Sequence, residues 1–88
     1  MDTHIENILQ KGVAAHAQGR LLDAERLYRR VLKTYPHQPD ANHNLGVMAL
    51  SADDNSRALA LFKTALDANS KIEQYWLSYI DALIQTNN

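Results

Sequence analysis

Residues 12–32 read GVAAHAQGRLLDAERLYRRVL, and residues 46–66 read GVMALSADDNSRALALFKTAL. Laying the second stretch on the first, position by position, superposes residues of matching size. The matching pairs are Gly12 with Gly46, Ala15 with Ala49, Ala24 with Ala58, Leu27 with Leu61, Tyr28 with Phe62, Val31 with Ala65 and Leu32 with Leu66. A self-match at this period, filled with helical pattern, is typical of repeated helix–turn–helix units. The sequence therefore predicts an all-α solenoid of antiparallel helix–turn–helix repeats.

Five helices are expected in a single domain that spans residues 1–88. Apolar residues at helical spacing predict helices over 4–17, 21–34, 40–51, 55–68 and 73–86. Two full repeats, at about 5–38 and 39–72, are followed by the final helix. We expect Gly19 to end the first helix in a left-handed conformation and Asp54 to cap the start of the fourth.

Composition excludes several classes of function. The chain has no cysteine, which removes disulfides, thiolate metal sites and thiol nucleophiles. A net charge of −1 gives no global reason to expect binding to nucleic acid or to an anionic membrane. No apolar run approaches the roughly 20 residues that cross a bilayer. The N-terminus lacks the basic start and apolar middle of a signal peptide, so a cytoplasmic protein is expected.

Motifs for catalysis and for metal or cofactor binding are missing from the sequence. There is no glycine-rich phosphate loop and no nucleophile elbow, so we predict neither an enzyme nor a cofactor. The histidines do not pair at metal-ligand spacing, so no metal site is expected; they are His4, His16, His37 and His43. One face of the second helix is basic and is expected to be solvated rather than bound to nucleic acid; it carries Arg26, Arg29, Arg30 and Lys33.

The final helix is apolar over more of its surface than one covered side requires. On an ideal helical wheel its apolar arc spans roughly 220°, whereas one covered side needs a stripe of about 100°. Its narrow polar face holds Gln74, Ser78, Asp81 and Gln85. Either the chain is the front of a longer protein, or it is complete and the apolar arc meets a partner. In both cases we expect self-association as a dimer through Trp76, Leu77, Ile80, Leu83 and Ile84.

The repeat resembles the tetratricopeptide repeat family over nearly the whole chain. The family's preferred residues are matched in the first repeat by Gly12, Ala24, Tyr28 and Pro36, and in the second by Leu45, Gly46, Ala58, Phe62 and Ala65. Lys11 and Ser70 depart from the family pattern, which favours leucine and proline at those positions. In the truncated third unit, Ile80 stands at the position where the family prefers glycine or alanine. The segments PDANHNLGVMAL and QYWLSYIDALI are similar to N-terminal repeats of larger bacterial members that carry glycosyltransferase or sulfotransferase domains.

This resemblance implies a superhelix whose first helices line a concave groove. The implied groove residues are Leu9, Val13, His16, His43, Asn44, Val47, Leu50 and Asp81. Of the carboxylate clamp that some members use to hold a peptide C-terminus, only Asn44 is matched, which disfavours that partner class. The resemblance thus implies a protein–protein interaction module that binds a peptide or helix in the groove, self-associates through the last helix, or does both. The alternative is an N-terminal assembly segment of a larger enzyme, such as a glycosyltransferase with such repeats.

Overall fold

The computed structural model describes residues 1–87 and contains five α-helices, with no strand in that part of the chain. The helices are α1 (Thr3–Ala17), α2 (Leu21–Thr34), α3 (Pro39–Ser51), α4 (Asn55–Ala68) and α5 (Glu73–Thr86). The prediction of an all-α repeat fold is confirmed. Of the five predicted starts, two differ: α1 begins one residue earlier than predicted, and so does α3.

The early start of α3 follows from the local sequence. Pro39 occupies the first helical turn, where its fixed φ suits a helix and its missing N–H costs nothing. Gln38 caps the helix, because its side-chain oxygen accepts a hydrogen bond from the Ala41 N–H at 2.6 Å. At the start of α1, Asp2 caps in the same way, with its Oδ1 accepting from the Ile5 N–H at 2.9 Å.

The turn inside each helix pair also recurs with the repeat. Gly19 has a φ of +76° and Asp53, its equivalent in the second pair, has a φ of +61°. In each turn the next amide bonds back to the preceding helix, Arg20 N–H to the Ala15 carbonyl and Asp54 N–H to the Ala49 carbonyl, both at 2.9 Å. This left-handed ending confirms the expectation for Gly19, and it makes Asp53 a non-glycine residue in a conformation that favours glycine.

Glycine is required where the two helices of a pair cross. A Cβ atom added to Gly12 would lie 2.9 Å from Cε1 of Tyr28, and one added to Gly46 would lie 2.5 Å from Cε1 of Phe62. Both aromatic rings are fully buried. The two glycine positions found in the sequence repeat are therefore sites where an aromatic side chain of the second helix rests on the backbone of the first.

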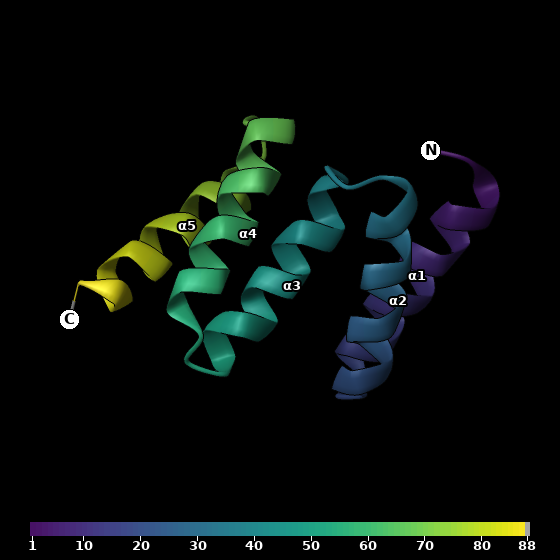
Figure 1. The fold of residues 1–88 in the computed structure, drawn as a ribbon, viewed down its shortest axis with the longest axis horizontal. Helices are drawn as coiled ribbons and strands as arrows, with labels where there is room; N and C mark the ends of the chain where they lie inside the picture. The colour runs from purple at the N-terminus through teal and green to yellow at the C-terminus, as the bar shows by residue number, and fades with distance from the viewer. Residues whose placement is uncertain (88) are drawn as a thin grey trace.

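The helix pairs stack in chain order into an elongated molecule of about 40 × 26 × 20 Å. Figure 1 shows α1 and α2 at one end, α3 and α4 in the middle, and α5 at the other end, with the two termini far apart. One core cluster joins the first pair to α3 and includes Leu9, Tyr28, Ala41 and Leu45. A second cluster joins α3 and α4 to α5 around Phe62 and Ala82. Each repeat is thus completed by the first helix of the next one.

Candidate functional site

Six of the eight predicted groove residues are at least partly exposed: Val13, His16, Asn44, Val47, Leu50 and Asp81. The other two, Leu9 and His43, are buried, so their assignment to an open groove surface needs correction. Leu9 is only 2% exposed and lies in the core cluster with Ala41 and Leu45 of α3. The reason is the stacking of repeats, because the first helix of the following repeat covers this position.

Leu9, His43 and Leu77 hold the same place in successive repeats. The first two are buried beneath α3 and α5 respectively, whereas Leu77 is 51% exposed. No helix among residues 1–87 covers this side of α5. The exposure of Leu77 therefore reflects an uncovered helix surface and not a difference in residue character.

His43 joins α3 to α5 through one hydrogen bond and contacts its neighbour Asn44 through another. Its Nε2 lies 2.8 Å from Oγ of Ser78, and its Nδ1 lies 3.3 Å from Oδ1 of Asn44. Asn44 in turn donates from Nδ2 to the Tyr28 hydroxyl at 3.2 Å, and that hydroxyl lies 3.4 Å from Nδ1 of His16. A continuous chain of polar contacts therefore runs from α5 through α3 and α2 to α1.

The arrangement determines the tautomer of His43. Because the Asn44 amide nitrogen points at Tyr28, its oxygen faces His43 and must accept from Nδ1–H. Nε2 then accepts from the Ser78 hydroxyl. The neutral imidazole satisfies both partners, so the ring is fixed in one orientation.

Aromatic packing surrounds the same imidazole. Tyr75 stacks on His43 with ring centroids 4.8 Å apart, and Phe62 lies at 5.4 Å. Burial lowers the pKa of His43, while the bond to Asn44 and the nearby Asp40 carboxylate act in the opposite direction. The Tyr75 hydroxyl donates to Asp40, and burial together with that carboxylate raises the pKa of the Tyr75 phenol. His43 is thus held neutral inside the contact between α3 and α5.

Ser78 lies at this contact and not on the polar face that the helical wheel assigned to it. It is 9% exposed, and Gln74 also donates to its hydroxyl at 3.3 Å. Ser78, His43 and Asn44 are linked in series by hydrogen bonds. This is the same connectivity as that of a nucleophilic serine with its general base. Here the serine lies within α5, and its neighbouring amides are engaged in helical hydrogen bonds rather than free to bind an oxyanion. The arrangement serves to dock α5 onto α3.

The predicted self-association residues form an apolar surface along α5. Trp76, Leu77, Ile80, Leu83 and Ile84 are each between 37% and 57% exposed, and we call this surface the α5 face. The indole N–H of Trp76 donates to the Ser70 carbonyl at 2.7 Å, which fixes the ring across the start of the helix. The opposite side of α5, with Tyr75 and Ala82, is buried against α4 and α3. The α5 face is therefore open, and its Trp76 ring is held by a hydrogen bond to the backbone.

Ile80 gives the α5 face a shape that differs from that of the earlier repeats. It stands at the repeat position that Gly12 and Gly46 hold before it, where an aromatic ring rests directly on the helix backbone. A branched side chain at this place blocks such an approach. Whatever covers the α5 face must pack on Ile80 from farther away than Phe62 packs on Gly46.

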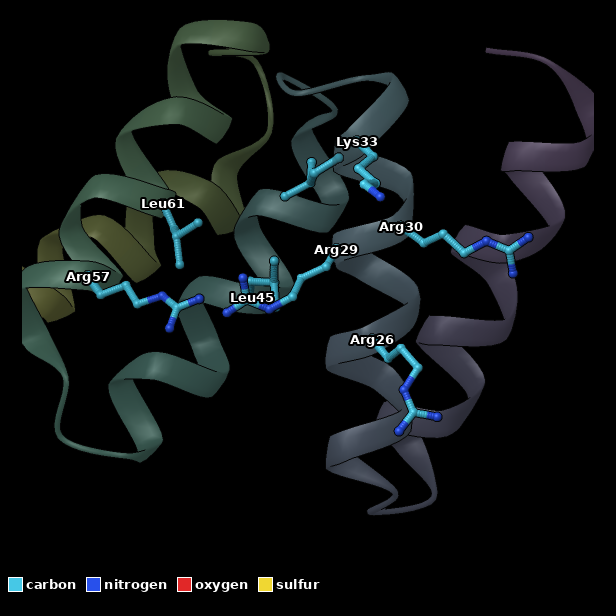
Figure 2. Close-up of a pocket in the computed structure, with 8 residues that line it drawn as sticks. Arg26, Arg29, Arg30, Lys33, Leu45, Arg57 and Leu61 are labelled. Carbon is cyan, nitrogen blue, oxygen red and sulfur yellow. The ribbon is translucent and has the colours of Figure 1, made fainter.

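A basic hollow of about 590 Å³ lies on another side of the molecule, between α2 and α4. It is lined by Arg26, Arg29, Arg30, Leu32, Lys33, Leu45, Arg57 and Leu61. Figure 2 shows the side chains of Arg29 and Arg57 extending toward Leu45 from opposite helices. The sequence identified the basic face of α2 but not the contribution of Arg57, Leu45 and Leu61, because these three residues come from α3 and α4, whose position beside α2 only the fold defines.

Clusters of metal-binding side chains and membrane-spanning helices were both sought within residues 1–87. Within them, no group of three or more histidine, aspartate and glutamate side chains lies close enough to hold a metal ion. None of the helices described is both long enough and apolar enough to cross a membrane.

The repeat pattern is matched among known protein families. A family model described as tetratricopeptide repeat matches residues 9–71, which is more than half of the chain. None of the curated proteins compared with the chain matches it.

Proposed function

Because the chain belongs to the tetratricopeptide repeat family, whose repeats generally mediate protein–protein interaction, we propose that it is an interaction module that self-associates through the α5 face. The predicted groove residues that remain accessible on the earlier helices, among them Val13 and Asn44, stay free in this arrangement for a peptide or helical partner.

The observation that carries the proposal is the size of the α5 face. Its five side chains expose on the order of 400 Å² of apolar surface, within the range of about 300–600 Å² for the largest patch on a typical monomer. Two copies would then bury about 800 Å² of apolar surface, close to the apolar share of a standard interface of about 1,600 Å². This area supports the proposed dimer.

A second copy of α5 suits the shape of this surface. Ile80 stands near the middle of the helix, and a two-fold axis beside it brings equivalent residues of both copies together. Aliphatic side chains then interdigitate at ordinary interhelical distance, without the close approach that Ile80 prevents. A symmetric helix pair is also a closed arrangement, which stops at two subunits.

The charges on α5 should make the association of the proposed dimer depend on salt concentration. Helix α5 carries Glu73 and Asp81 and no lysine or arginine. Two copies bring like charges toward each other at the edge of an apolar contact, so added salt should strengthen the association by screening the repulsion.

Light scattering on a sizing column across a concentration series tests the proposal. We expect a dimer for the wild type and a monomer for Ile84→Asp, because a carboxylate would be buried without a partner. The matched control is Leu22→Asp, since Leu22 lies on α2 and is 79% exposed. This control should leave the dimer intact. A wild type that remains monomeric at the highest concentration, or a Leu22→Asp variant that dissociates equally, would contradict the proposal.

A further inference from the structure

The hollow between α2 and α4 combines a strongly basic rim with an apolar floor. Five of the nine lysines and arginines of the chain line it: Arg26, Arg29, Arg30, Lys33 and Arg57. Its three leucines are buried or half-buried, with Leu45 nearly inaccessible. We call it the basic cleft.

The positive charge in the basic cleft is only partly neutralised. Within residues 1–87, Arg29 pairs with Glu25 at 3.1 Å and Arg26 approaches Asp23 at 4.0 Å. No ion pair in that part of the chain engages Arg30, Lys33 or Arg57. Cations gathered without carboxylates repel one another, and a bound anion relieves this repulsion.

The basic rim is not a general property of the repeat. The residues of α4 that are equivalent to the four cations of α2 are Ala60, Lys63, Thr64 and Asp67. Helix packing does not demand a basic face at these positions, since α4 folds in the same way without one. The charges of α2 are therefore specific to this surface.

The leucines at the floor of the basic cleft favour one class of anionic ligand over another. Proteins that bind single-stranded nucleic acids combine cations with aromatic rings on which bases stack, and no residue that lines the cleft is aromatic. Leucines instead receive aliphatic or aromatic side chains of a peptide. The cleft thus complements a segment that has both carboxylates and a bulky apolar residue.

We propose that the basic cleft binds an acidic peptide segment of a partner protein, with Lys33 and Arg57 contacting its carboxylates and Leu32, Leu45 and Leu61 receiving an apolar side chain. Arg29 joins them when its side chain exchanges Glu25 for a carboxylate of the ligand. The inference rests on the proposed role in protein binding, but it uses a surface separate from the α5 face.

Fluorescence anisotropy with a labelled peptide of glutamates and two leucines tests this assignment. The wild type should bind the peptide, with affinity falling as salt is added. The double variant Lys33→Glu with Arg57→Glu should bind at least about tenfold more weakly, as expected for the loss of one charged hydrogen bond or more. The control Lys71→Glu makes the same type of charge change in the exposed α4–α5 connection and should bind within about twofold of wild type.

Three comparisons make the test decisive. Replacing the peptide leucines by serine should weaken binding, and equal binding would overturn the role of the leucine floor. Tighter binding of a single-stranded oligonucleotide than of the peptide would overturn the choice of ligand. Equal weakening by Lys71→Glu would reduce the effect to net charge and overturn the site.

Folding and assembly are measured on the same samples. Circular dichroism checks that the variants fold, and the neutral pair Lys33→Gln with Arg57→Gln should give an intermediate loss of binding if the charge-reversed protein does not fold. Light scattering reports the oligomer independently. A double variant that loses peptide binding but remains a dimer would support the cleft as a site separate from the α5 face. A wild type that is monomeric but binds the peptide would contradict the proposed self-association and leave the cleft proposal standing.

Discussion

Helices α3 and α5 occupy the same place in successive repeats but meet different surroundings. Helix α3 is covered by α4 on one side and by α5 on another, so Gly46 and His43 are buried. Helix α5 packs on α4 and α3, and its equivalents of those two residues, Ile80 and Leu77, are about half exposed. The difference shows that burial in this chain depends on which neighbour follows a helix.

The two helices also differ in what they require from a neighbour. Helix α3 needs glycine so that Phe62 can rest on its backbone, whereas Ile80 of α5 prevents such an approach. The contrast predicts that equivalent substitutions will have unequal effects along the repeat. We expect the loss in the free energy of unfolding to decrease from the buried leucine to the crossing glycine, the histidine and the helix cap.

The largest effect is expected from comparing Leu9→Ala with Leu77→Ala. Both remove the same atoms at the same repeat position, but Leu9 is buried and Leu77 is not. Leu9→Ala should lower the free energy of unfolding by about 3 kcal/mol, and Leu77→Ala by less than about 1 kcal/mol. Urea denaturation in an Ile84→Asp background measures both without a contribution from association. Equal losses in the free energy of unfolding for Leu9→Ala and Leu77→Ala would contradict the difference in burial between the two positions.

Gly46→Ala should have the next largest effect. The added methyl group lies 2.5 Å from the buried Phe62 ring, which must shift. The loss should be about 2 kcal/mol, because overpacking outweighs a gain of about 1 kcal/mol in helix propensity. The natural control is Gly12→Ala, where the nearest ring atom of Tyr28 lies 2.9 Å away. Thermal unfolding should show a smaller loss for Gly12→Ala, and the reverse order would contradict the geometry.

The contact between α3 and α5 should weaken in acid because of His43. Its pKa in the folded chain is lowered from the ordinary 6.5, so the unfolded chain binds the proton more readily. The stability that His43 contributes is therefore present above pH 6.5 and falls as the pH drops below that value, until the lowered pKa is reached. Urea midpoints measured from about pH 7.5 down to about pH 5 should reveal the decline.

Two histidine variants isolate this contribution. His43→Gln should flatten the pH dependence relative to wild type, because the titrating group is gone. His37→Gln, which replaces an exposed histidine outside the contact between α3 and α5, is the matched control. Identical slopes in all three proteins would assign the pH dependence to other groups.

The smallest effect concerns the helix caps. Gln38 caps α3 through its side chain, whereas Ile72 at the same place before α5 makes no such bond. Gln38→Ala should cost about 0.5–1 kcal/mol, and Ile72→Ala should cost less. Hydrogen exchange of the first amides of each helix gives the most direct reading. Faster exchange at the start of α3 alone is the expected pattern.

The fold could be predicted from the sequence because short-range patterns within each repeat indicate its helices and turns. Helix boundaries follow from apolar spacing, and the left-handed turn at Gly19 follows from glycine itself. The recurrence of glycine at 12 and 46 was visible in the sequence, but only the structure shows that the rings of Tyr28 and Phe62 rest on these glycines.

Burial between repeats could not be read in the same way. The family resemblance placed Leu9 and His43 in an open groove, and a helical wheel placed Ser78 on a polar face. Neither accounts for the neighbouring helix that covers these positions. A signal was nevertheless present. Successive repeats hold leucine, histidine and leucine at 9, 43 and 77, which is an unusual series for a surface that faces solvent. No comparable pattern in the sequence indicated that Arg57 lies in the basic cleft.

Trp76 is the only tryptophan in the chain, and it lies on the α5 face with its indole N–H bonded to the Ser70 carbonyl. Its emission, excited selectively over that of the tyrosines, therefore comes from a single ring that water still reaches. Any molecule that covers α5 will shift that emission to shorter wavelength, while a ligand in the basic cleft will leave it unchanged. The emission of Trp76 therefore reports on the α5 face, the surface through which self-association is proposed.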